Sequence, residues 1–283
     1  MPDCPVVDAH LHLWDPSVFP MPWLADNVLL NRRYDLDDYA AAGAGLDIVG
    51  MVYVQTDVAV PYALLEAQWV ADLAAHDPRI RGIVPFAPLE DGDQARAYLD
   101  ALVHISPHIK GVRRILQGEP VDFCLQPRLV RGVQVLADYG LSFDLCITNA
   151  QLANTVQLVR QCPRTQFMLD HLAKPDIAAQ RLAPWREHLR QLAAFPNVCC
   201  KVSGAVTEAD HHHWTIEDVK PFVHHALDVF GEDRVAFGGD WPVVLQAAPY
   251  RRWVVTLEAL TAHLSLAGRR KLWADNAIRF YRL

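Results

Sequence analysis

Near its start the chain reads VVDAHLHLWD at residues 6–15, a short apolar run that ends in two histidines with one residue between them. If the run is a strand, its period of two places His10 and His12 side by side on the same face. Two imidazoles that aim at one point, at the carboxyl end of a strand, mark a metal or catalytic site more often than core packing. The stretch therefore predicts both the first strand and the first part of a functional site.

Size and composition describe a globular protein with a sizeable core. The chain has 283 residues, of which 52% are hydrophobic and 21% are charged, and its formal net charge is −7. No basic cluster stands out, so neither nucleic acid nor an anionic membrane surface is an expected partner. No apolar run is long enough for a membrane span, and no secretory signal pattern opens the chain. The six cysteines show neither a CxxC pair nor a disulfide spacing, so we expect a cytoplasmic protein.

Short apolar runs alternate with helical patterns along the whole chain. We expect strands at residues 6–13, 48–55, 80–87, 109–115, 141–147, 166–171, 198–202 and 235–239. We expect helices at residues 35–42, 61–76, 93–103, 127–139, 151–161, 184–195, 216–230, 250–263 and 267–282. Eight strands, nearly all followed by a helix, over about 250 residues favour a (β/α)8 TIM-type barrel. An open doubly wound sheet would need a glycine-rich phosphate turn after the first strand, and none is present. No linker divides residues 1–283, so we expect a single α/β domain.

In a (β/α)8 barrel the active site is built at the carboxyl ends of the strands. Most of the expected strands contain polar residues or are directly followed by one. These residues are His10, His12, Lys110, Arg113, Arg114, Asp144, Asp170, His171, Lys201, Ser203 and Asp240. Each has a structural alternative; His171 alone could be a satisfied core histidine, and Asp144 or Asp170 could be a structural or orienting group. Arg113 and Arg114 are adjacent, so at most one of them points inward. The coincidence across five or six strands is what indicates a site.

Tryptophans also cluster near the expected strand ends. Trp14, Trp23 and Trp241 fall in or just after these loops, where a ring face can stack on the apolar side of a sugar; ordinary loop packing is the alternative for each. The proline-rich stretch 16–31 is a long first loop that could cover a pocket. The triple histidine at residues 211–213 lies in an expected loop, and consecutive residues cannot all face one metal ion, so we expect it to be peripheral.

Three motifs resemble the amidohydrolase superfamily: DAHLH at residues 8–12, LDHLAKP at 169–175 and GDWP at 239–242. KVSG at residues 201–204 is also similar to its amidohydrolase 2 branch, which holds hydrolases of sugar lactones and dicarboxylate lactones. The resemblance extends over essentially the whole chain and is strongest to proteins like L-fucono- and L-rhamnono-lactonase. It implies a hydrolase built on a TIM-type barrel.

The resemblance also implies a limited metal content. Binuclear members of the superfamily use a carboxylated lysine or a glutamate on the fourth strand and a histidine on the fifth. Here the expected fifth strand, 141–147, has no histidine, and Lys110 lies at the start of the fourth, so we expect no two-metal site. Ligands for one zinc-like ion remain, namely His10, His12, His171 and Asp240. Lactonases of this branch can also work without a metal, and the same four residues would then serve as proton-transfer and oxyanion groups. Both alternatives stay open.

Hydrolysis of a lactone needs an activated water, a polarised carbonyl group and a proton for the departing alkoxide. We expect Asp240 to be the general base, with its pKa raised by burial and with His171 or a metal ion holding it in place. His10 and His12 would bind the metal ion or donate hydrogen bonds to the oxyanion. The other expected site residues are Arg113 in catalysis, and Arg114, Lys174, Trp14, Trp23 and Trp241 in substrate binding.

The expected function is hydrolysis of a small sugar lactone, similar to L-fucono-lactone, to the aldonic acid. One alternative is a hydrolase of dicarboxylate lactones, which would want several inward arginines and lysines where only one or two are expected. Another is a decarboxylase of the same superfamily, which demands a tightly held zinc ion. A third is a barrel that binds carbohydrate without turnover. The scarcity of inward cations favours a neutral polyol lactone.

Overall fold

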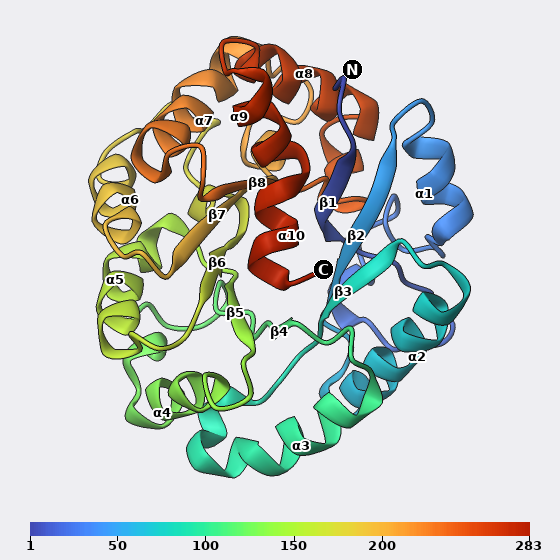
Figure 1. Cartoon of the computed structure of the whole chain (residues 1–283), viewed down its shortest axis with the longest axis vertical. Helices are drawn as coiled ribbons and strands as arrows, with labels where there is room; N and C mark the ends of the chain where they lie inside the picture. Colours follow the sequence, from blue (N-terminus) through green and yellow to red (C-terminus); the bar gives the residue numbers. More distant parts are fainter.

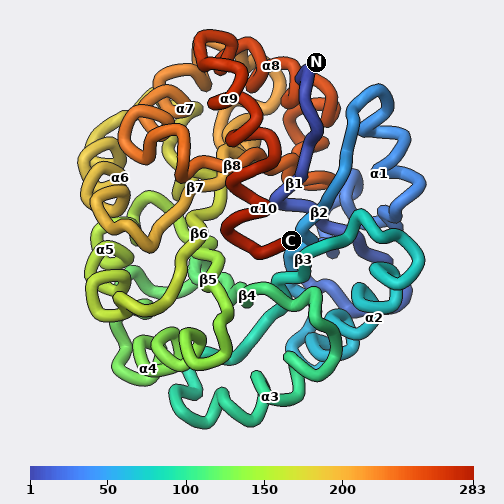
Figure 2. Tube along the Cα trace, viewed as in Figure 1, coloured from blue at the N-terminus to red at the C-terminus, as the bar shows by residue number.

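Eight parallel strands surround a common axis in the computed structural model, which describes residues 1–283, and helices cover them on the outside (Figure 1). The strands are β1 Val6–Leu11, β2 Ile48–Val54, β3 Ile80–Val84, β4 Gly111–Val112, β5 Ser142–Leu145, β6 Phe167–Leu169, β7 Val198–Val202 and β8 Val235–Phe237. The outer helices are α1 Leu36–Ala42, α2 Ala63–His76, α3 Ala95–Ile105, α4 Pro127–Leu136, α5 Leu152–Gln161, α6 Trp185–Ala193, α7 Ile216–Phe230 and α8 Tyr250–Thr261. The trace in Figure 2 passes round the ring in sequence order.

Backbone hydrogen bonds close the ring. The ladders form one sheet of β1 to β3 and a second of β4 to β8. Between β3 and β4, Lys110 N donates to the carbonyl oxygen of Ile83 over 3.0 Å. On the other side, His12 N donates to Trp241 O and Asp240 N donates to His10 O, both over 2.8 Å. These bonds join the end of β1 to the loop after β8, so the predicted (β/α)8 barrel is confirmed.

The last segment of the chain closes the amino-terminal end of the barrel. It consists of α9 Leu266–Arg270, a π-helical turn at Lys271–Asp275, and α10 Asn276–Tyr281, which crosses the ring in Figure 1. Tyr281 is fully buried among residues of the barrel interior, including Val7 and Val52. Arg282 donates to the carbonyl oxygens of Lys110 and Gly140, which precede β4 and β5. The opposite, carboxyl end of the barrel is therefore the one left open for a site.

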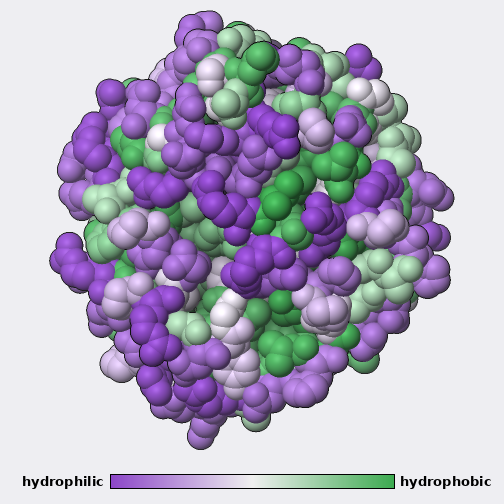
Figure 3. Space-filling model, viewed as in Figure 1, coloured by the Kyte–Doolittle hydropathy of each residue, from purple (hydrophilic) through white to green (hydrophobic).

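The exterior is consistent with the composition. Seen from the side of Figure 1, the surface is mostly hydrophilic, with small hydrophobic areas between the polar side chains (Figure 3). None of the helices has the length and apolar character needed to cross a membrane.

All strands except β7 are shorter than predicted, and β4 and β6 are two clear cases. The predicted strand 109–115 keeps only two ladder residues, Gly111 and Val112, which pair with β5, although Arg113 N still donates to the carbonyl oxygen of Pro85 just beyond β3. The predicted strand 166–171 ends at Leu169, because residues 171–174 all have positive φ, between 49° and 61°. Four consecutive non-glycine residues in this conformation are costly, and such strain is found mainly at functional sites.

Candidate active site

A cavity of about 280 Å³ opens at the carboxyl ends of the strands. This volume is just below the roughly 300–1,000 Å³ typical of small-molecule sites. The predicted site residues that line it are His12, Trp14, Trp23, Arg113, His171, Lys174 and Asp240. These residues come from loops after β1, β4, β6 and β8, so the structure brings together side chains that are up to 228 positions apart (240 − 12).

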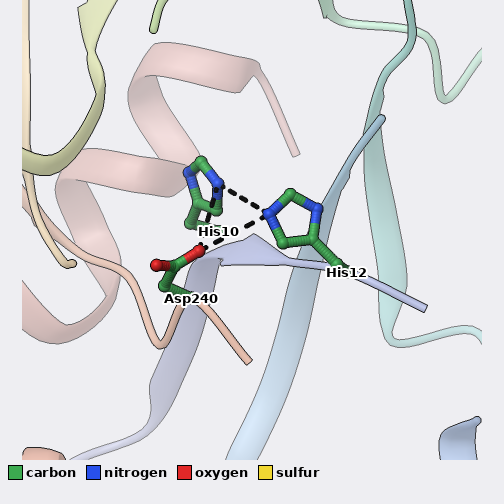
Figure 4. Close-up of side chains that lie close together, drawn as sticks. All are labelled: His10, His12 and Asp240. Atoms are coloured by element: carbon green, nitrogen blue, oxygen red, sulfur yellow. Dashed lines mark hydrogen bonds and ion pairs between the residues drawn. The ribbon is translucent and has the colours of Figure 1, made fainter. Parts of the chain in front are cut away.

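His10, His12 and Asp240 form the floor of the site and point toward one another (Figure 4). The Nε2 atoms of the two histidines are 3.1 Å apart. The Oδ1 atom of Asp240 lies 3.5 Å from His12 Nε2 and 3.8 Å from His10 Nε2. His171 approaches from the other side, with its Nε2 3.9 Å from the same carboxylate oxygen. One carboxylate is therefore surrounded by three imidazoles.

The hydrogen-bond partners of the histidines fix where their protons can be. His12 Nδ1 lies 2.7 Å from the carbonyl oxygen of Val54, which can only accept, so the proton is on Nδ1 and the lone pair is on Nε2. His10 Nδ1 has both a donor and an acceptor nearby: Lys201 Nζ at 3.2 Å and Asp170 Oδ1 at 3.3 Å. His10 can therefore present either an N–H or a lone pair from Nε2 toward His12.

The donor set fits one tetrahedral metal ion. Ligand atoms about 2.0–2.1 Å from a tetrahedral zinc ion lie about 3.3 Å from one another. The distances of 3.1, 3.5 and 3.8 Å among His10, His12 and Asp240 match this spacing. When the His10 Nδ1–H faces Asp170, the arrangement is the carboxylate–histidine pair that orients metal-bound imidazoles. Arg113 Nη1, 3.3 Å from His10 Nε2, is the competing partner for that lone pair.

Burial and charge set the protonation of this floor. Burial raises the pKa of Asp240, but His171, His12 and His10 lower it by more, and the net pKa lies well below the usual range. Burial also lowers the pKa of all three histidines, in the case of His171 to about 4. At neutral pH the site therefore holds an ionised carboxylate among neutral imidazoles. The expectation of a raised Asp240 pKa is wrong, because the imidazoles outweigh the burial.

A buried ion network lies directly beneath the floor. Lys201 Nζ is 2.6 Å from Asp144 and 3.0 Å from Asp170, and Arg113 Nη1 is 3.3 Å from Asp170. Arg113 Nη2 also donates to the carbonyl oxygen of Gln55 over 2.5 Å. Burial would raise the pKa of Asp170, but Lys201 and His10 lower it well below its usual range. Two cations face two carboxylates, so the charges beneath the site balance.

Residues of the KVSG motif at 201–204 contact the imidazole ring of His171 and fix its position. Ser203 Oγ lies 2.9 Å from His171 Nδ1 and orients the ring. Gly204 has a φ of +59°, and a Cβ there would lie 2.6 Å from the same ring nitrogen. Any larger residue would displace the imidazole. His171 and Asp240 themselves have φ of 53°, so both are held in strained backbone over the cavity.

Several predicted residues lie elsewhere than expected. Arg114 points away from the cavity because Glu90 and Glu119 bind its guanidinium at 2.9 and 2.6 Å, so its predicted role in substrate binding has no support from its position. Trp241 is 1% exposed and does not line the cavity, because its ring packs against two buried tyrosines. His211, expected to be peripheral, lines the rim.

The sequence reasoning missed part of the cavity wall. Thr56 and Asp57 follow β2, and Glu208 and His211 lie in the loop after β7. Thr56 and Asp57 directly follow a predicted strand that ended at residue 55, so applying the strand-end rule to that strand would have found them. No pattern marks Glu208, because the 3-10 helix that carries it, Val206–Glu208, is too short to show a helical period.

Comparisons with known proteins agree with this geometry. A family model described as amidohydrolase matches residues 7–283. The chain is 29% identical to an L-fucono-1,5-lactonase of Burkholderia ambifaria, over 98% of this chain and 95% of the relative. It is 30% identical to an L-fucono-1,5-lactonase of Burkholderia multivorans, over 98% and 96% respectively. A crystal structure of a Burkholderia multivorans amidohydrolase with bound zinc superimposes with a TM-score of 0.89 at 29% identity, covering 99% of this chain and 100% of that one.

Proposed function

The chain belongs to the amidohydrolase family, and from that premise we propose that it is a lactonase that opens a neutral sugar lactone to the aldonic acid. The observation that carries the proposal is the ionised Asp240 carboxylate among three neutral imidazoles, at the floor of a cavity lined by hydrogen-bonding groups. The two similar L-fucono-1,5-lactonases support the substrate class.

Asp240 is the proposed general base. It accepts a proton from a water molecule as the water oxygen attacks the carbonyl carbon of the lactone. Its low pKa makes it a weak base, so it acts mainly by position, and such catalysis contributes about 10²- to 10⁴-fold. The water is oriented between the carboxylate and His171, whose Nε2 is 3.9 Å from Asp240 Oδ1.

The tetrahedral intermediate carries a negative charge on the former carbonyl oxygen. Arg113 supplies a fixed positive charge at the cavity wall. When the bond between the carbonyl carbon and the ring oxygen breaks, Asp240 returns its proton to that oxygen. The product is the ring-opened acid, and Asp240 ends the cycle ionised.

A divalent ion such as zinc would be held by His10, His12 and Asp240, with His171 in reach, and would supply Lewis-acid chemistry at the carbonyl oxygen and the attacking water. The amidohydrolase structure with bound zinc supports this assignment. Beneath the floor, Asp170 faces His10 Nδ1 and holds the His10 ring in the orientation that a metal ligand requires.

The charges of the cavity favour a neutral substrate. Two cations, Arg113 and Lys174, face three carboxylates, Asp57, Glu208 and Asp240, so the lining carries a net charge of −1 (2 − 3). Both cations are engaged, since Arg113 binds Asp170 and Lys174 lies 3.8 Å from Glu208. A dicarboxylate lactone would meet no free cation here, whereas a polyol can use every one of these groups.

A proton-release assay with a panel of lactones tests the proposal. We expect turnover of neutral aldonolactones, with L-fucono-1,5-lactone among the best, and at least about 100-fold lower kcat/KM for a pyrone dicarboxylate, because two unpaired carboxylates would enter a negative cavity. Faster turnover of the dicarboxylate would favour the alternative lactone class. Absence of hydrolysis, together with CO₂ release from an aromatic acid, would favour the decarboxylase.

A further inference from the structure

Asp57 is a charged residue without a partner in the cavity wall. It lies just beyond the carboxyl end of β2 and lines the cavity. Its backbone N–H is bonded, but its carboxylate makes no hydrogen bond and no ion pair within the chain. The other two carboxylates of the cavity, Asp240 and Glu208, both have such partners. Asp57 is therefore the acidic group of the lining that is free to bind a ligand.

The turn that carries Asp57 is held by other side chains. Its φ is +58°, a conformation that aspartate and asparagine tolerate better than most residues. Asp57 N donates to Gln55 Oε1 over 2.5 Å, and both Thr56 N and Thr56 Oγ1 donate to the buried carboxylate of Glu66 over 2.7 Å. Aspartate in a turn commonly bonds its own backbone with its carboxylate. Here that bonding is done by Gln55 and Glu66, and the Asp57 carboxylate is left for another use.

Trp23 is fixed beside this turn. Its indole N–H donates to the carbonyl oxygen of Thr56 over 2.8 Å, one residue before Asp57. Trp14 meets the Trp23 ring edge to face, with ring centroids 5.5 Å apart and an interplanar angle of 83°. Trp23 is nevertheless 39% exposed and lines the cavity. An immobilised, open indole therefore lies next to a free carboxylate.

We propose that Asp57 and Trp23 form a hydroxyl-binding subsite, in which the Asp57 carboxylate accepts hydrogen bonds from hydroxyl groups of the sugar lactone and the Trp23 indole covers an apolar face of its ring. A carboxylate offers about four lone-pair sites and binds hydroxyls through charge-assisted hydrogen bonds. The inference rests on the proposed function and deepens it, because it names the residues that select a polyhydroxylated substrate.

The electrostatics of the wall support this subsite. Partial burial raises the pKa of Asp57, and Arg113 and Arg114 lower it in part, but the side chain remains exposed in the cavity wall and has no direct partner. The negative charge of Asp57 also repels a carboxylated lactone. The subsite therefore favours hydroxylated lactones and disfavours carboxylated ones.

The test compares two six-membered lactones, L-fucono-1,5-lactone and δ-valerolactone, which has the same ester ring without hydroxyl groups. Asp57→Asn preserves the size of the side chain and tolerates the left-handed backbone. We expect it to lower the ratio of the two kcat/KM values by about 10- to 100-fold, the loss of one or two charge-assisted hydrogen bonds. Asp228→Asn, an exposed change on α7, is the matched control and should keep the wild-type ratio. An unchanged ratio for Asp57→Asn would overturn the subsite.

A binding measurement separates the subsite from the chemistry. Trp14 and Trp23 line the cavity, so tryptophan fluorescence can follow titration with L-fucose, which is not hydrolysed. We expect Asp57→Asn and Trp23→Leu each to weaken L-fucose binding at least about 10-fold. If the wild type hydrolysed no lactone but bound L-fucose in an Asp57-dependent way, the proposed function would fail and the subsite would stand. Binding that is the same in wild type and Asp57→Asn would exclude the subsite.

Discussion

The ammonium group of Lys201 lies 2.6 Å from the carboxylate of Asp144, and neither side chain has any exposure to solvent. Tyr281, from the helix that closes the barrel, donates to the same carboxylate oxygen over 2.6 Å. Lys201 also contacts Asp170 and His10, which border the site. The pair therefore connects the closed amino-terminal end of the barrel with the catalytic floor.

Removal of the lysine should leave Asp144 buried without a counter-ion and Asp170 with Arg113 alone. We expect Lys201→Met to lower the free energy of unfolding by about 3–5 kcal/mol, the usual cost of breaking a buried pair. Lys220→Met, which removes a solvent-exposed pair with Glu217, should cost less than about 1 kcal/mol. Urea denaturation measures both, and equal losses would show that the buried pair contributes no more than a surface one.

The adjacent arginines allow a matched test of the cavity wall. Arg113→Lys loses the bonds to Gln55 and Asp170 together, because an ammonium cannot reproduce the guanidinium geometry. We expect its kcat/KM to fall about 100-fold. Arg114→Lys changes ion pairs with Glu90 and Glu119, which do not line the cavity, and a bond to the backbone of Ile115, so its kcat/KM should stay within about threefold of the wild type. Steady-state kinetics on one lactone measures kcat/KM for both variants. A larger fall for Arg114→Lys than for Arg113→Lys would mean that the wrong arginine was assigned to the cavity wall.

Much of this architecture could be predicted from the sequence. The alternation of apolar runs and helical periods predicts eight strands, and the strand-end rule then places His12, His171 and Asp240 in one site, because parallel strands in a barrel end at the same face. His10 follows from the period of two on β1, although it lies below the cavity and is fully buried.

The rest depends on interactions that no local pattern encodes. The sequence could not decide between Arg113 and Arg114, because Glu90 and Glu119 that bind Arg114 lie on other segments. It could not give the direction of the Asp240 pKa shift, since that depends on three imidazoles from two distant strands. Trp241 was expected to face substrate, but tertiary packing buries it.

The low pKa of the buried histidines predicts loss of stability in acid. An unfolded histidine titrates near 6.5, whereas His171 in the fold titrates at about 4. Between these values the unfolded state binds more protons, so stability falls as the pH drops from about 6.5 to about 4. In chelator-treated protein, we expect His171→Gln to reduce the slope of unfolding free energy against pH by up to about 1.4 kcal/mol per unit. Denaturation curves at several pH values measure the slope, and an unchanged slope would contradict the shift.

Metal removal distinguishes catalysis that needs a bound metal ion from catalysis by the His and Asp side chains alone. Without an ion, Lys201 can donate to His10 Nδ1, and His10 Nε2–H can then donate to His12 Nε2, so the imidazoles keep their positions. We therefore expect chelated protein, shown to be metal-free by elemental analysis, to retain measurable lactone turnover. Turnover that disappears on chelation and returns with zinc would show that the residues alone do not suffice.

The central claim is that Asp240 takes the proton from the attacking water. The most direct measurement is kcat for L-fucono-1,5-lactone in the wild type and in Asp240→Asn, together with L-fucose binding followed by fluorescence. We predict that kcat falls by about 10²- to 10⁴-fold while L-fucose binding stays within a few-fold, because the substitution removes the base and preserves its shape. An Asp240→Asn variant that kept the wild-type kcat would contradict the account.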